Sequence, residues 1–136
     1  MYFRLVDRFL ELSDTQAVGI KNVTAAEEYL QDHFPGFPVL PGVFMVEALT
    51  QAARAVLEKR GHRRMVLGEV KALRYGSFVR PGETLRVEVS LDKAREDGTF
   101  VFKAQGTVVR GVGLAQAESP AETAVSGRLI LRPLRA

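Results

Sequence analysis

The chain has 136 residues, which suits one domain with a small core, and hydrophobic residues make up 46% of it, which excludes a disordered polymer. Its 19 Lys and Arg against 16 Asp and Glu leave a net charge of +3, without the dense basic stripe that nucleic-acid binding needs. The absence of cysteine excludes disulfides, thiolate catalysis and cysteine-based zinc sites, and no apolar stretch is long enough to span a bilayer. We therefore expect a single cytoplasmic domain over residues 1–136.

Two strands and a short helix are predicted near the start of the chain. Residues 4–12 (RLVDRFLEL) and 17–23 (AVGIKNV) are strand-like and flank a turn. Thr24 and Glu27 have the spacing of a capping box, which predicts a short helix over residues 25–31, with a polar loop as the alternative.

A long helix is predicted from Gly42 to about Lys59. It begins after a proline and ends before Gly61, a typical residue just past a helix end. Because residues 43–53 are apolar almost all round, the pattern indicates a buried helix that the rest of the chain wraps. The polar exceptions within that run are Glu47, Thr50 and Gln51.

The remainder of the chain is strand-like. Turns at 81–82 (Pro-Gly) and 97–98 (Asp-Gly) separate the first three strands, and the small polar stretch 115–124 is expected as a loop before the last. An antiparallel sheet curled around one central helix satisfies this order, so the predicted class is α+β. The predicted strands are residues 65–75, 85–94, 100–110 and 125–132.

Packing does not explain two polar residues in the stretch 32–47 (DHFPGFPVLPGVFMVE). Burial of Glu47 in an apolar helix favours its protonated form, which makes it a candidate acid. The alternative is a glutamate at the helix surface, paired with an arginine. His33 lies in a loop that Pro and Gly hold in a defined path, and histidine titrates near neutral pH, so it is a candidate base. A structural role is the alternative for this histidine.

Gly42 adds a third group to this candidate site. At the start of a helix its backbone N–H lacks an intrahelical partner, and the positive end of the helix dipole lies there. Such a donor suits a carbonyl oxygen on which negative charge develops. A base, an acid and an oxyanion donor together indicate proton abstraction beside a carbonyl, followed by loss of a leaving group.

The segment HFPGFPVLPGVFMVEALTQ (33–51) resembles the signature of the FabZ-type 3-hydroxyacyl-[acyl-carrier-protein] dehydratases. The flanking segments LVDRFLEL, AVGIKNVT and RPGETLRVEV are similar to the same family, so the resemblance covers about residues 4–110. It implies a hot-dog fold, a sheet wrapped around one long helix. It also implies an enzyme of fatty-acid biosynthesis that dehydrates (3R)-3-hydroxyacyl thioesters to trans-2-enoyl products, without a metal or redox cofactor.

The resemblance also implies a role for each matching residue. His33 matches the base that takes the C2 proton, and Glu47 matches the acid that helps the C3 hydroxyl leave and comes from the partner subunit. The Gly42 N–H matches the donor that polarises the thioester carbonyl. Gln51, one turn beyond Glu47 on the same helix face, is expected to orient its carboxyl group.

Family members are homodimers with shared active sites, often assembled as trimers of dimers, and the acyl chain lies in an apolar tunnel at the dimer interface. Each tunnel candidate has ordinary core packing as its alternative; they are Phe34, Phe37, Val39 and Phe44. The expected partner is an acidic acyl carrier protein that meets a basic rim. The rim candidates are Arg60, Arg63, Arg64, Arg132 and Arg135.

The sequence departs from the family pattern at two places. Residues 62–70 (HRRMVLGEV) lack an aromatic residue that often gates the tunnel, and residues 112–124 extend the final hairpin. Two other functions remain as hypotheses: a hot-dog thioesterase that uses Glu47 to activate water, and a non-catalytic acyl-binding subunit.

Overall fold

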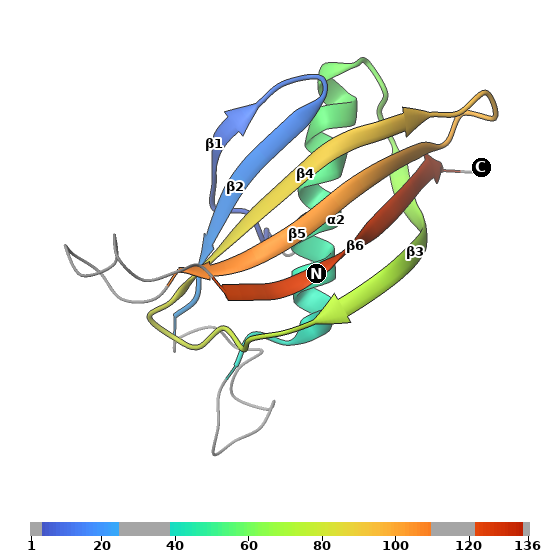
Figure 1. The fold of residues 1–136 in the computed structure, drawn as a ribbon. Helices are drawn as coiled ribbons and strands as arrows, with labels where there is room; N and C mark the ends of the chain where they lie inside the picture. Colours follow the sequence, from blue (N-terminus) through green and yellow to red (C-terminus); the bar gives the residue numbers. More distant parts are fainter. Residues whose placement is uncertain (1–3, 25–38, 110–121, 135–136) are drawn as a thin grey trace.

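The computed structural model describes residues 4–24, 39–109 and 122–134, in which six strands form one antiparallel sheet beside a single helix (Figure 1). The strand order is β1-β2-β4-β5-β6-β3, so β1 and β3 are the sheet edges. This arrangement confirms the predicted α+β class. The elements are β1 (Arg8–Leu12), β2 (Gln16–Asn22), α2 (Gly42–Lys59), β3 (Met65–Tyr75), β4 (Thr84–Ala94), β5 (Phe100–Val109) and β6 (Glu122–Pro133).

The helix α2 has the predicted bounds because local signals set both of its ends. At its end, Gly61 has a φ of 89°, a left-handed conformation that glycine adopts at little cost. The Gly61 N–H donates to the Glu58 carbonyl at 3.0 Å, and the His62 N–H donates to the Leu57 carbonyl at 2.9 Å. These two bonds form a Schellman motif, which satisfies carbonyls that the helix leaves unpaired.

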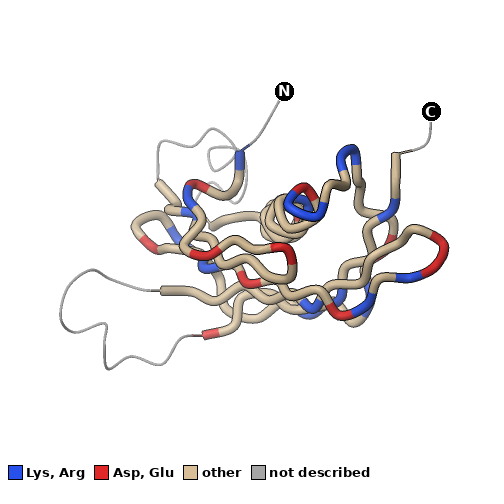
Figure 2. The backbone as a smooth tube through the Cα atoms, turned by 90° about the horizontal axis from the view of Figure 1, so that it is seen from above, with Lys and Arg blue, Asp and Glu red and all other residues tan. Residues whose placement is uncertain are grey.

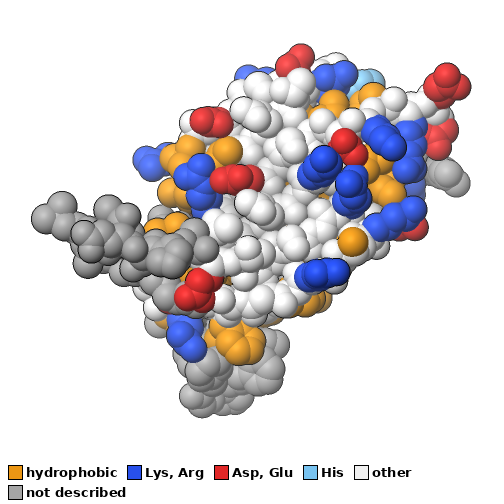
Figure 3. All heavy atoms as spheres, viewed as in Figure 1, with side chains coloured by type: hydrophobic (Ala, Val, Ile, Leu, Met, Phe, Trp, Pro, Cys, Tyr) orange, Lys and Arg blue, Asp and Glu red, His pale blue; other side chains and the backbone are white. Residues whose placement is uncertain are grey.

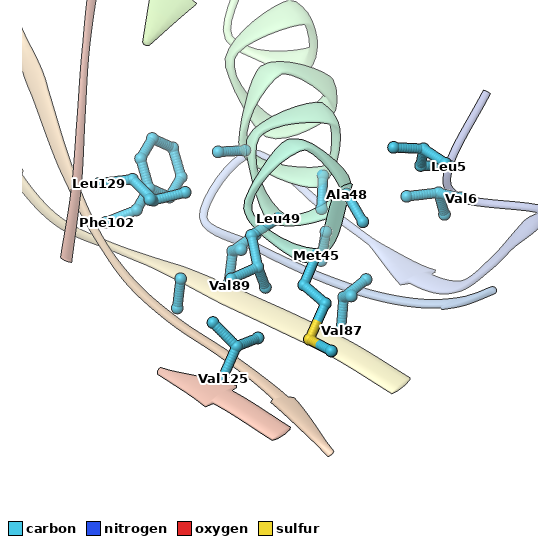
Figure 4. Close-up of a cluster of buried hydrophobic side chains, with 14 of the residues drawn as sticks. Leu5, Val6, Met45, Ala48, Leu49, Val87, Val89, Phe102, Val125 and Leu129 are labelled. Carbon is cyan, nitrogen blue, oxygen red and sulfur yellow. The ribbon is translucent and has the colours of Figure 1, made fainter. Parts of the chain in front are cut away.

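The core lies between α2 and the concave side of the sheet. Figure 4 shows Met45 and Leu49 of α2 pointing toward Val87 and Val89 of β4. All four side chains are at most 3% exposed. Small residues let the helix approach the sheet closely, since each added β-carbon would increase the separation. The alanines of α2 that are at most 1% exposed are Ala48, Ala52 and Ala53.

The prediction that α2 is buried on every side is wrong for the chain by itself. Figure 2 views the helix along its axis, with the sheet along one side of it. Val43 is 71% exposed, and the side chain of Glu47 is 41% exposed, because the sheet covers only the face that it contacts. An apolar pattern on both faces does not show which face the chain itself covers.

The final strand begins earlier than predicted. Glu122 pairs with Val108 and Thr123 pairs with Thr107, so residues 122–124 of the expected loop belong to β6. Backbone pairing decides this boundary, and the side-chain pattern carries little information about it. The predicted helix over residues 25–31 and most of the predicted loop lie outside the described residues. In the described part of the chain, no helix is both long and apolar enough to cross a membrane.

Candidate active site

The N-terminus of α2 opens onto an apolar pocket of about 390 Å³. The start of the helix supplies Gly42, Val43 and Met45 to its walls, and the segment after β3 supplies Phe78. Tyr75, the last residue of β3, lines the opposite side and is 52% exposed. The pocket therefore places an apolar surface beside the backbone donors of the first helical turn.

Gly42 lies against the ring of Tyr75, where a larger residue would push this half-exposed ring aside. A β-carbon built on Gly42 would lie 2.7 Å from the Tyr75 ring, closer than carbon atoms pack. The carbonyl of Pro41 accepts from the Phe44 N–H at 3.0 Å and from the Met45 N–H at 3.2 Å. No described residue accepts a hydrogen bond from the Gly42 N–H, which is a usual feature of the first turn of a helix.

Glu47 forms an ion pair on the helix face that the sheet leaves uncovered. Its Oε1 accepts a hydrogen bond from Arg54 Nη2 at 2.6 Å and a longer one from Gln51 Nε2 at 3.4 Å. The expectation of a carboxyl group cut off from water is thus wrong for the single chain, and the surface ion pair is what the structure shows. The physical reason is that the sheet covers only one face of α2 and Glu47 lies on another.

Gln51 links this carboxyl group to the start of the chain. The Leu5 N–H donates to Gln51 Oε1 at 2.8 Å, so the amide oxygen is occupied and the amide NH₂ faces Glu47. The structure therefore brings Gln51 and Glu47 together, as their spacing predicts. Arg54 was missed by the sequence reasoning. Arg54 could have been found from its spacing, because a residue seven positions after Glu47 lies on the same face of a helix.

Gly42 and Glu47 do not face the same space within one chain. Five residues separate them, which turns the helix by about 140° beyond a full circle and moves along it by about 7.5 Å. Gly42 lines the apolar pocket, whereas Glu47 is not among the residues that line it. A single chain therefore presents Gly42 and the Glu47 carboxyl group on different sides of α2.

The remaining predicted site residues fall in three places. Val39 is 2% exposed and lines the pocket, whereas Phe44 is partly buried against the hydrophobic core and does not line it. His33, Phe34 and Phe37 lie outside the described residues.

The rim arginines lie at the opposite end of α2 from Gly42, a helix length of about 27 Å away. Arg60, Arg63 and Arg64 follow the helix, and the Leu134 N–H donates to the Arg64 carbonyl at 2.8 Å. Arg132 pairs with Val66 beside them. Arg135 lies outside the described residues. In one chain, the arginine group and the apolar pocket are thus separate.

A larger hollow of about 560 Å³ lies on the outer face of the sheet and holds none of the predicted site residues. Arg74, Lys103 and Arg128 line it, and Figure 3 shows basic side chains gathered on one half of this face. A hydrogen bond from Arg128 lowers the pKa of Asp92 beside it. The hollow has a more polar lining than the pocket beside Gly42, so it is a poorer match to an acyl chain.

Solved structures with the same architecture define the class of protein. The dehydratase heterocomplex ApeI:P from Xenorhabdus doucetiae matches with a TM-score of 0.68 at 17% identity, over 97% of this chain and 84% of that chain. An uncharacterised Pyrococcus horikoshii protein, PH1136, matches with a TM-score of 0.68 at 14% identity, over 97% of this chain and 85% of that chain. These likenesses confirm the hot-dog fold.

Sequence comparisons then identify the family within that fold. The model of the ApeI-like family, described as ApeI dehydratase, matches residues 10–112. A protein of Pelotomaculum thermopropionicum named 3-hydroxyacyl-[acyl-carrier-protein] dehydratase FabZ is 48% identical over 83% of this chain and 81% of its own length. A protein of the same name from Herpetosiphon aurantiacus is 42% identical over 82% of this chain and 84% of its own length. The chain belongs to this family of hot-dog dehydratases.

Proposed function

We propose that the chain dehydrates (3R)-3-hydroxyacyl thioesters on an acyl carrier protein to trans-2-enoyl thioesters, in cytoplasmic fatty-acid biosynthesis. The observation that carries this proposal is the 48% identity to a relative named as a FabZ dehydratase. The apolar pocket of about 390 Å³ beside Gly42 supports it, because an acyl chain needs an apolar surface next to the group that binds the thioester.

In the proposed reaction, His33 removes the proton from C2 while the Gly42 N–H stabilises negative charge on the thioester oxygen. The electron pair forms the C2–C3 double bond as the C3–O bond breaks. Glu47 gives a proton to the departing hydroxyl group, which leaves as water. The proton taken by His33 balances the proton given by Glu47, so the step consumes no other reactant.

The proposed active unit is a homodimer in which Glu47 comes from the partner subunit. Gly42 and Glu47 lie on different sides of α2. This supports a shared site, because a single chain would not bring both groups to the same substrate. Exposed apolar side chains around the pocket also support association, since their burial is favourable. They include Val43 at 71%, Tyr75 at 52% and Phe78 at 51% exposure. Assembly of three such dimers stays a prediction, which the mass in solution tests.

Turnover on 3-hydroxyacyl chains attached to a carrier protein tests the proposed activity. Enoyl product is expected from the native chain, and Glu47→Gln is expected to lose about 100- to 10,000-fold in rate because its amide gives no proton. The unfolding temperature of this variant serves as the control for folding. Free thiol in place of enoyl product would identify a thioesterase, and wild-type turnover by Glu47→Gln would contradict the assigned acid.

A further inference from the structure

Arg54 and Glu47 form a short ion pair on α2, with 2.6 Å between Nη2 and Oε1. The two residues are seven positions apart on one face of the helix, so their α-carbons are separated by about 10.5 Å along its axis. The arginine side chain therefore extends back toward the helix N-terminus, the direction in which helical side chains lean. Its reach brings the guanidinium group to the carboxyl group proposed as the acid.

The contacts of the carboxyl group are divided unequally between its two oxygens. Oε1 accepts from Arg54 at 2.6 Å and from Gln51 at 3.4 Å. Oε2 accepts no hydrogen bond from any residue in the described ranges. The Leu5 N–H donates to Gln51 Oε1 at 2.8 Å, so one of the two donors on Oε1 is itself held in place. One oxygen is therefore anchored, and the other is left without a donor among the described residues.

Stability does not explain this use of Arg54. The side chains of the pair are 37% and 41% exposed, and ion pairs at this exposure contribute little to folding. The Arg54 Nε–H is buried without a hydrogen-bond partner among the described residues, which costs free energy. Holding a long side chain extended adds an entropic cost. An arrangement with little benefit to folding and two costs indicates a role in function.

We propose that Arg54 is a positioning residue for the acid of the dehydration reaction. It anchors Oε1 of Glu47 and leaves Oε2 to meet the C3 hydroxyl of the substrate. This inference rests on the proposed function, because it gives Glu47 the role of acid.

The proposal also fixes where the transferred proton lies. Because Oε1 accepts from two N–H donors, the proton that Glu47 gives away is carried on Oε2. As the C3–O bond breaks, that proton moves to the departing hydroxyl group and Glu47 becomes a carboxylate. The guanidinium group at 2.6 Å stabilises the negative charge as it develops. Arg54 therefore lowers the barrier of the chemical step without touching the substrate.

Steady-state kinetics of Arg54→Met and Arg54→Lys test this role. Arg54→Met keeps the apolar stem but loses the charge and the donors, so kcat is expected to fall by about 10- to 100-fold with KM within about twofold. Arg54→Lys is expected to keep an intermediate kcat, and millimolar guanidinium is expected to restore part of the rate of Arg54→Ala. Wild-type kcat in both Arg54→Met and Arg54→Lys would overturn the proposal.

A matched control separates positioning from the general effect of losing a surface ion pair. Arg86 and Glu88 form a pair at 2.9 Å on β4, with side chains 41% and 40% exposed, away from α2. Arg86→Met therefore removes an ion pair of similar exposure and is expected to leave kcat unchanged. A loss in Arg86→Met as large as that in Arg54→Met would contradict a specific role for Arg54.

The double variant with Glu47→Gln distinguishes failure of this inference from failure of the proposed function. If Arg54 acts through Glu47, Arg54→Met is expected to lower the residual rate of Glu47→Gln no further. A further fall of tenfold or more, on the order of its effect in the native chain, would show a separate role and overturn the inference. An inactive Glu47→Gln beside a fully active Arg54→Met removes the inference and leaves the proposed function intact. A fully active Glu47→Gln removes both.

Discussion

On the side that faces the sheet, α2 presents small and branched apolar residues, with Ala52 and Val56 fully buried. On the other side it presents an exposed valine, Val43, and a charged pair, Glu47 and Arg54. Strands of the same chain cover the first side, whereas Val43 is 71% exposed and the Glu47 side chain is 41% exposed on the second. The difference separates the part of the helix that stabilises the fold from the part that is available for chemistry and association.

Leu49→Ala is expected to have the largest effect on stability, because it removes a side chain that is 1% exposed on the sheet-facing side. The loss of burial and the cavity left behind are expected to cost about 2–5 kcal/mol of the free energy of unfolding. Urea denaturation measures this change in the free energy of unfolding. As the matched control on the other face, Val43→Ala is expected to change the same quantity by less than about 0.5 kcal/mol in the monomer. Equal losses at the two positions would remove the distinction between the faces.

Gly42→Ala is expected to have an intermediate effect, at the point where the two faces meet. The added β-carbon would lie 2.7 Å from the Tyr75 ring, so the ring or the helix start has to shift, at a cost of about 1–3 kcal/mol. We expect dehydratase activity to fall as the backbone donor moves away from the thioester. Gly61→Ala, at the other end of α2, changes a glycine with no atom within 4 Å and is expected to lower stability through its positive φ while sparing kcat. A normal kcat in Gly42→Ala would show that this donor tolerates displacement.

Val43→Asp is expected to have the smallest effect on the folded chain and to act on association instead. Val43 is 71% exposed, so a charge there costs the single chain little, whereas in a dimer it would be buried. Sedimentation is expected to show a shift toward monomer. Leu10→Asp, at a residue of β1 that is 45% exposed, is the control and is expected to leave the mass unchanged. An unchanged mass for Val43→Asp would place any interface elsewhere.

Much of the fold was predictable because local signals carry it. The bounds of α2 follow from a proline before Gly42 and a glycine at position 61, and the strands follow from alternation and from turn residues. The start of β6 at Glu122 was not predictable, because pairing with β5 extends the strand through residues with little pattern of their own.

One contact of the candidate site was predictable, and its surroundings were less so. The position of Gln51 beside Glu47 follows from helix periodicity. The exposure of Glu47 depends on which face of α2 the sheet covers. Because both faces carry apolar residues, the sequence does not indicate which one that is. Arg54 was missed because a residue seven positions away meets its partner only when its side chain extends along the helix.

The most direct test of the account mixes two inactive variants, His33→Ala and Glu47→Gln, after each has been shown to fold. In a shared-site dimer, each mixed dimer holds one site with both mutations and one site with neither. Random exchange in an equal mixture therefore predicts recovery of about a quarter of native turnover. No recovery, despite demonstrated subunit exchange, would contradict the claim that base and acid come from different chains.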